Sequence, residues 1–357
     1  MLEHARTPPG KAAQNHAMNT ILATAPLGFP WQTIDPFLFC VHHHDLYPRG
    51  NAILGPDAPL HGRSLGQDFG GKDGWSMYHG MTVPGFPAHP HRGFETLTIV
   101  RRGLIDHSDS LGATARFGGG DVQWLTAGKG IVHCEMFPLV HADQDNPTEL
   151  FQIWLNLPAR SKMADPHFTM FWHEQIPRLH HTDDAGRSTE AVCVAGRLGE
   201  LQGLPPPPDS WASAADSDLA VTTVRMEPGA RWTLPATTHP QTRRVLYFFQ
   251  GDAMQIAGTA VAGRQVIEVN AAHDCPLVAG DSVCELLVLQ GRPIGEPVAQ
   301  HGPFVMNTAA EIQQAFADYR RTQFGGWPWQ APDPVHPRQQ GRFARHGDGR
   351  LDEPGSR

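Results

Sequence analysis

The sequence predicts an all-β protein made of two antiparallel β-barrels, followed by a helix. Glycine and proline are plentiful, at 37 and 32 of 357 residues, and charged residues make up only 18%. Such a composition is typical of short strands joined by turns. Apolar runs of strand length follow one another without a helix-length segment between them. Their rhythm recurs in the second half of the chain, which indicates an internal duplication of one barrel.

Residues 1–30 are polar, small and proline-bearing, and we expect them to form a flexible arm. Ordered structure is predicted to begin at the apolar run of residues 31–41. Residues 42–75 are rich in histidine, glycine, proline and aspartate, which indicates a long loop. The loop opens with His42-His43-His44. We expect these side chains on the surface, because adjacent residues on a strand point to opposite faces and rarely converge on one metal.

A first barrel is predicted over residues 31–165. Between Trp75 and Leu157 the chain alternates short apolar runs with turns; the runs are GWSMYHGMTVPGF, ETLTIVRRG, LIDHSDS, ATARFGGG, DVQWLTAG, GIVHCEMF and LFQIWLNLP. The runs lie close together, without the helical crossovers that parallel strands need. We therefore expect antiparallel pairing.

A second barrel is predicted over residues 166–326. Its run RRVLYFFQG is similar to ETLTIVRRG, and the glycine–aspartate of VAGDS corresponds to that of GGGDV. These correspondences carry the inference of a duplication. The stretch GLPPPPDSWASAADSD is rich in proline and polar residues, so we expect it to be an exposed loop.

A helix is predicted over residues 308–324. Thr308 is followed three residues later by Glu311, which is the spacing of a capping box. Apolar side chains then recur at helical intervals, namely Ile312, Phe316 and Tyr319. Residues 327–357 are rich in proline, glycine and charge, and we expect a disordered tail there.

Charge and cysteine content exclude several classes of function. The net charge of −8 gives no electrostatic basis for direct binding to nucleic acid. Five scattered cysteines without CxxC spacing favour a reducing compartment over a disulfide framework. No stretch reaches the roughly 20 apolar residues of a membrane helix, and no basic segment followed by an apolar one marks a secretory signal. We therefore expect a soluble, cytoplasmic protein without a membrane partner.

Two pairs of polar residues stand out within the first barrel: His89 with His91, and His133 with Glu135. Side chains at positions i and i+2 of a strand point to the same face, so each pair can reach into one space. Two such strands brought together would place three imidazoles and one carboxylate around one point. We predict a metal site there, because two same-face pairs beside glycine turns rarely coincide by chance.

Three histidines and a carboxylate suit a borderline divalent ion such as Fe(II), Mn, Ni, Cu or Zn. Four protein ligands leave one or two positions of an octahedron for water, substrate or O2, so such a site can carry out chemistry. Glu95 offers an alternative carboxylate, since it follows His91 with the same parity unless Gly93 introduces a bulge. It could be a ligand in place of Glu135, or a hydrogen-bond partner of a ligating histidine.

The segments HPHRGFETLTIV, HSDSLG, GDVQWLTAGKGIVHCEM and GPFVMNTAAEI, together with Gly103, resemble the pirin family of the cupin superfamily. The resemblance implies a bicupin, with metal in the N-terminal barrel only. It also implies Fe(II) as the metal and four ligands, namely His89, His91, His133 and Glu135. In agreement, the second series of strands contains His239 but no HxH or HxE pair. Residues 42–75 and the extended ends depart from the family pattern.

Two functions follow from this resemblance. The first is a dioxygenase of the quercetin 2,3-dioxygenase type. The metal would orient a flavonol-like or other enolic small molecule beside O2, and Glu135 or Glu95 would take the substrate proton. The alternative is a non-catalytic iron protein that senses redox state and binds a protein partner, as a transcriptional co-regulator does. It would present a basic rim of Arg92, Arg101, Arg102 and Lys129. A metal-stabilised fold without activity is a third, simpler hypothesis.

Overall fold

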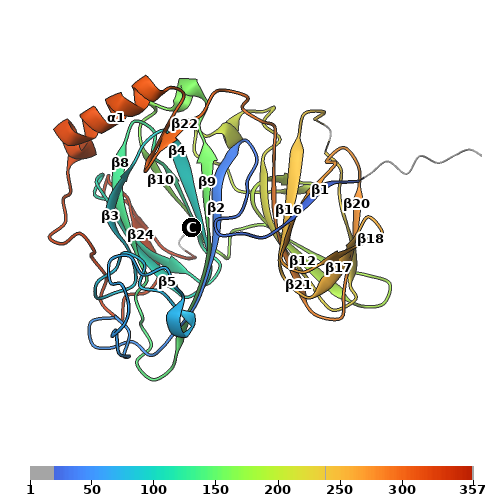
Figure 1. Ribbon diagram of the computed structural model, residues 1–357, viewed down its shortest axis with the longest axis horizontal. Helices are drawn as coiled ribbons and strands as arrows, with labels where there is room; N and C mark the ends of the chain where they lie inside the picture. The colour runs from blue at the N-terminus through green and yellow to red at the C-terminus, as the bar shows by residue number, and fades with distance from the viewer. Residues whose placement is uncertain (1–19, 238, 356–357) are drawn as a thin grey trace, which may run out of the picture.

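The computed structural model describes residues 20–237 and 239–355, which form two β-sandwich domains lying side by side (Figure 1). Each domain contains two sheets of antiparallel strands, arranged as a jelly roll. The predicted all-β fold with a repeated unit is confirmed, with open sandwiches in place of closed barrels. Part of the arm predicted at the N-terminus, residues 1–19, lies outside the described residues.

The first domain contains the strands that carry the candidate metal site. One of its sheets has the order β10 (His167–Phe171), β7 (Val122–Thr126), β4 (Phe94–Arg102), β9 (Asn146–Asn156) and β2 (Phe37–Tyr47). The other has the order β25 (Leu351–Asp352), β24 (Phe343–Arg345), β6 (Thr114–Gly118), β5 (Leu104–Asp109), β8 (Ile131–Met136) and β3 (Gly85–His91).

The second domain is built in the same way. Its larger sheet has the order β1 (Ile21–Pro26), β19 (Gln265–Val269), β16 (Arg243–Gln250), β21 (Cys284–Gly291), β14 (Ala220–Met226), β12 (Ser188–Leu198) and β11 (Arg178–Thr182), and β13 (Leu201–Gln202) pairs with β12. Its smaller sheet has the order β15 (Arg231–Leu234), β20 (Cys275–Ala279), β17 (Ala253–Ile256) and β18 (Thr259–Ala262). Apolar side chains fill the space between these sheets.

The two domains are joined by an apolar core. Strands β4 and β9 of the first domain alternate between two faces. One face carries residues such as Leu97 and Ile153, which pack against Tyr247 and Leu287 of the second domain. The opposite face, which carries Thr98 and other polar side chains, points into the first domain. Both faces are therefore buried, and the face toward the second domain is mostly apolar, although Glu95 and Arg101 of β4 also reach that domain.

The predicted helix is confirmed as α1 (Ala309–Thr322). Thr308 caps it through a reciprocal capping box, in which the Thr308 hydroxyl accepts from Glu311 N–H and Glu311 accepts from Thr308 N–H. The helix follows the hairpin of β22 (Ala299–His301) and β23 (Phe304–Met306). Both elements lie against the first domain, where Arg92 pairs with Asp318 at 2.9 Å. Shorter 3₁₀ turns occur at Lys72–Gly74, Ala159–Ser161, Trp211–Ser213 and Gln323–Gly325.

The predicted loop at residues 42–75 begins later than expected, because residues 42–47 continue strand β2. The three adjacent histidines therefore alternate in direction. His42 lies at the domain interface beside Glu149, His43 is buried in the first domain, and His44 is exposed. The surface prediction is wrong for His43, because strand alternation sends every second side chain inward.

The tail predicted to be disordered is instead ordered over residues 327–355 and runs along the first domain. Its strand β24 extends the six-stranded sheet by pairing with β6. The buried guanidinium of Arg116 forms two hydrogen bonds of 2.7 Å with Asp106 and also donates to the carbonyls of His336, Pro337 and Gln340. Proline-rich backbone leaves its carbonyls free of internal hydrogen bonds. Composition alone could not show that Arg116 donates hydrogen bonds to these carbonyls.

Two predicted domain boundaries also differ from the structure. Strand β1, which lies within the predicted arm, pairs with β19 of the second domain. Strand β10, which lies beyond residue 165, pairs with β7 of the first domain. Figure 1 shows the blue N-terminal strand β1 among the yellow and orange strands of the second domain, and the dark-red strand β24 in the first domain.

Candidate metal centre

The candidate site forms where strands β3 and β8 pair. His89 lies directly opposite His133 in the register, after a shift between Phe86 and His89. His91 follows two residues later on the same strand. The three residues can each offer one ring nitrogen so that these atoms lie within 4.8 Å of one another. Strand β3 is the edge of its sheet, which explains why it tolerates Pro90, since proline has no N–H for a second neighbour.

Hydrogen bonds and burial leave ring nitrogens of these histidines free for a metal. His89 Nδ1 lies 2.8 Å from the carbonyl of Pro87, so it donates there and leaves Nε2 with its lone pair. Neither ring nitrogen of His133 has a hydrogen-bond partner within the described part of the chain, although both are buried. Burial lowers the pKa of His89 to about 4 and holds the pKa of His91 and of His133 well below the usual value. Three neutral imidazoles around one point fit a divalent transition metal.

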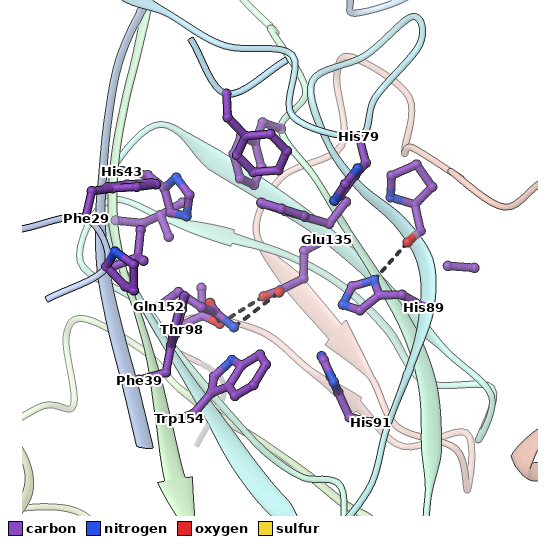
Figure 2. A pocket seen from close by; sticks show the side chains of 18 residues that line it. Phe29, Phe39, His43, His79, His89, His91, Thr98, Glu135, Gln152 and Trp154 are labelled. Carbon is purple, nitrogen blue, oxygen red and sulfur yellow. Dashed lines mark hydrogen bonds between the residues drawn. The ribbon is translucent and has the colours of Figure 1, made fainter. Parts of the chain in front are cut away.

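Glu135 points into the same space from strand β8. Its carboxylate accepts a hydrogen bond from the Thr98 hydroxyl at 2.8 Å and a longer one, 3.4 Å, from the Gln152 amide (Figure 2). Burial raises the pKa of Glu135, and the bond from Thr98 opposes this rise. Within the described residues, the group that meets the 4.8 Å limit contains the three histidines without Glu135. Coordination by Glu135 thus stays a prediction.

Glu95 lies elsewhere, and we correct the expectation that it belongs to the site. Its carboxylate accepts from Thr126 at 2.7 Å and from Ser210 at 2.6 Å, and Ser210 comes from the second domain. The side chain is fully buried and is absent from the cavity beside the histidines. His91 and Glu95 do not lie on one continuous strand, because β3 ends at His91 and β4 begins at Phe94. Gly93, at φ 85°, turns the chain between them, so the even spacing of the two residues does not place their side chains on the same face.

A cavity of about 510 Å³ opens beside the cluster and is lined there by His89, His91 and Glu135. Its walls are mostly aromatic or apolar, and the polar groups are concentrated at the histidines and around Glu135 (Figure 2). The aromatic residues are Phe29, Phe39, Phe69, Phe86, Phe137 and Trp154. A concave apolar space with a few convergent polar groups is the usual form of a small-molecule site.

The comparisons with known proteins agree with this geometry. The Pirin family matches residues 29–155, and the Pirin C-terminal cupin domain matches residues 221–325. A provisionally named quercetin 2,3-dioxygenase of Vibrio cholerae is 34% identical over 256 residues, covering 68% of this chain and 80% of the relative. The chain belongs to the pirin family. Human Pirin is a further member, 34% identical over 258 residues that cover 70% of this chain and 80% of that protein.

A solved structure supports the two-domain cupin fold. The crystal structure of quercetin 2,3-dioxygenase from Acinetobacter baumannii has a TM-score of 0.68 and 26% identity, and it covers 87% of this chain and 99% of that protein. The second pirin match ends at residue 325. The ordered tail of residues 327–355 therefore lies beyond the residues that match the pirin family.

Three histidines near the site were not identified from the sequence, and one of them, His79, lines the cavity. His43 lines the cavity, and the signal for it was strand alternation within the histidine run. His107 lies opposite Glu135 in the pairing of β5 with β8, and its ring centroid is 5.6 Å from that of His133. It forms a buried pair with Asp109 at 3.1 Å. The alternation His107-Ser108-Asp109 carried the same period-2 signal as the ligand pairs.

The predicted basic rim is largely neutralised by acidic partners. Arg92 is buried and paired with Asp318. Arg101 bridges the domains by pairing with Glu149 and Glu285. Lys129 pairs with Asp165 on the surface.

None of the helices within the described residues is long and apolar enough to cross a membrane.

Proposed function

We propose that this protein is an iron-dependent dioxygenase that acts on a flavonol-like or other enolic small molecule. Fe(II) would be held by His89, His91, His133 and Glu135. The observation that carries the proposal is the three-histidine cluster, of which His89 and His91 line an aromatic cavity of about 510 Å³. The quercetin 2,3-dioxygenase names of several relatives support the same substrate class.

The metal, when bound, supplies Lewis-acid polarisation of an enolic oxygen and one-electron chemistry with O2. The protein's own residues supply the rest. The aromatic walls exclude water and hold a flat ligand by its faces. Glu135 would accept the enolic proton on its carboxylate, which the Thr98 hydroxyl holds in place by a hydrogen bond of 2.8 Å.

Aerobic turnover tests the proposal directly. Protein loaded with iron to a measured stoichiometry is mixed with quercetin and related flavonols, while oxygen consumption and flavonol absorbance are recorded. We expect oxygen uptake matched by flavonol loss. We also expect Glu135→Gln to lower kcat by roughly 100-fold or more, as removal of a general base does. Full iron occupancy without oxygen uptake for any flavonol would refute the dioxygenase.

The alternative function, redox-dependent binding of a protein partner, gains no support from the site. Three of the four residues of the basic rim on which it relied, Arg92, Arg101 and Lys129, are engaged in ion pairs within the chain. We therefore put forward the dioxygenase as the single proposed function. We also propose, as predicted from the sequence, that the protein is cytoplasmic.

A further inference from the structure

A chain of three buried polar side chains begins at the cavity wall, away from the three-histidine cluster, and continues behind it. His43 on β2 lines the cavity, and Figure 2 shows it across the space from His89 and His91. Asp45 lies two residues further along β2. Tyr78 comes from the long segment between β2 and β3. These three side chains are only 3–6% exposed.

The hydrogen bonds of this chain run in one direction. The Tyr78 hydroxyl donates to Asp45 Oδ2 at 2.7 Å, and the backbone N–H of Ser76 donates to the other carboxylate oxygen at 2.9 Å. Because its only proton is committed to Asp45, the Tyr78 oxygen accepts from His43 Nδ1 at 2.9 Å. His43 is therefore held as the tautomer with the proton on Nδ1. Nε2 keeps its lone pair and has no hydrogen-bond partner among the described residues.

The backbone around Tyr78 is built to hold this arrangement. Tyr78 has φ 56°, a left-handed conformation that costs a non-glycine residue roughly 1 kcal/mol or more. Reciprocal backbone hydrogen bonds of 2.8 and 2.9 Å with Asp68 fix it. The Asp68 carboxylate is in turn bound by Arg63 at 2.9 Å and by Met77 N–H at 3.0 Å. A conformation of this cost persists only where the surrounding contacts enforce it.

The surroundings of His43 are aromatic rather than charged. Its ring lies edge-on to Tyr78, Phe86 and Phe137, with centroids 4.8, 5.9 and 6.4 Å away. Burial lowers the pKa of His43 to about 3, so the ring stays neutral at physiological pH. Nε2 is thus a permanent acceptor set in an apolar wall. Nε2 is not among the buried side-chain atoms that lack a partner, and His43 lines the cavity. A ligand that excludes water from this atom has to donate a hydrogen bond to it, because leaving it unpaired would then be costly.

We propose that His43 Nε2 recognises a hydroxyl group carried by an aromatic ligand at the end remote from the three-histidine cluster. Asp45 and Tyr78 are positioning residues that fix the tautomer. The inference rests on the proposed function in taking the ligand to be an aromatic small molecule with one oxygen-bearing end at the cluster. It adds a second recognition point, which selects among such molecules for those with a distal phenolic hydroxyl.

Ligand affinity tests this proposal without requiring turnover. The probes are 3-hydroxyflavone and its derivatives with one further hydroxyl on either outer ring, titrated anaerobically against the metal-loaded protein. We expect at least one dihydroxy probe to bind tenfold to a hundredfold more tightly than 3-hydroxyflavone, as a buried acceptor discriminates. His43→Phe removes this preference. His44→Phe, the same change at the neighbouring exposed residue, retains it.

Two further measurements separate the positioning role from simple packing. Tyr78→Phe keeps the ring but removes the hydroxyl, so we expect a reduced preference and ¹⁵N shifts showing that His43 Nδ1 no longer carries the proton in full. Thermal unfolding of each variant confirms that it folds, and His43→Gln replaces His43→Phe if the latter does not.

Equal affinities of the wild-type protein for all probes, or a preference that survives in His43→Phe, would overturn the recognition role. An unchanged preference and unchanged ¹⁵N shifts in Tyr78→Phe would overturn the positioning role. A clear preference combined with no oxygen uptake would refute the dioxygenase and leave this inference standing.

Discussion

At the scale of single residues, His133 is the most informative side chain in the molecule. Both of its ring nitrogens are buried without a hydrogen-bond partner in the described part of the chain. An unsatisfied buried polar group costs about 1–3 kcal/mol. A fold carries such a group where its role compensates for the cost, and metal binding is the role that the neighbouring His89 and His91 suggest.

Replacement of His133 by leucine therefore separates stability from function. We expect His133→Leu to lose at least nine-tenths of bound metal by elemental analysis. We also expect the metal-free variant to unfold at the same or a higher temperature than metal-free wild type, because the unsatisfied nitrogens are gone. His239→Leu, in the second domain, should keep full metal content. Metal retention by His133→Leu would contradict the proposed ligand set.

Glu95 makes stability depend on pH. Burial raises its pKa to about 7 from the ordinary 4.5, so the folded state binds this proton more tightly than the unfolded state. The stabilisation is complete below about pH 4.5 and is lost as the pH rises through 7. It amounts to at most about 3–4 kcal/mol, since one pKa unit corresponds to about 1.4 kcal/mol.

Glu95→Gln should abolish that dependence. We expect the free energy of unfolding of the metal-free variant, measured with urea between pH 5 and 8, to fall less steeply with pH than that of wild type. At pH 8 the variant should have the larger free energy of unfolding. Parallel curves would show that Glu95 is ionised in the folded state across this range.

The same residues show what the sequence could and could not predict. The i, i+2 spacing of His89 with His91 was sufficient to place both rings together, because strand alternation is local. The choice between Glu95 and Glu135 was not predictable in this way. It depends on the turn at Gly93 and on Ser210, which approaches Glu95 from the second domain. Long-range partners of this kind leave no trace in local spacing.

At the scale of elements, the turn between β3 and β4 connects the candidate metal centre to the hairpin of β22 and β23. A Cβ on Gly93 would lie 1.9 Å from the Val305 carbonyl oxygen. Val305 N–H also donates to the Arg92 carbonyl at 3.0 Å, and the Pro303 carbonyl lies 3.4 Å from His91 Nδ1. The hairpin of β22 and β23 thus rests directly behind a candidate ligand.

Gly93→Ala should therefore affect both stability and metal binding. We expect a loss of more than about 2 kcal/mol, since the left-handed φ alone costs roughly 1 kcal/mol and the clash adds to it. Weaker metal binding in a competition titration should accompany it. Gly112→Ala is a matched control, because Gly112 has φ 82° but open space around it. Gly112→Ala should lose only the roughly 1 kcal/mol of stability that the left-handed φ costs, and it should bind metal as the wild type does.

At the scale of the whole molecule, the two ends of the chain are exchanged between the domains. The N-terminal strand β1 belongs to the second domain's larger sheet, and the C-terminal strand β24 belongs to the first domain's. Repetition of the strand pattern predicted two similar units. It did not predict this exchange, since β1 and β24 lie in segments whose composition indicated disorder.

As a result, the two fragments made by cutting the chain between the domains should stay associated in the native fold. A protease site placed in the exposed turn at residues 184–186 would yield two fragments, each holding a strand that completes the other's domain. We expect them to co-elute on size exclusion and to bind metal as the uncut protein does. Separation of the fragments without denaturant would contradict the exchange.

This exchange also constrains how the protein can evolve. Recombination at a single junction between the domains would combine halves from two different homologues. Strand β1 would then have to pair with β19 of the other homologue, and β24 would have to pair with β6 of the other homologue. We therefore expect the two cupin domains to be inherited as one unit and to diverge by substitution rather than by exchange of whole domains.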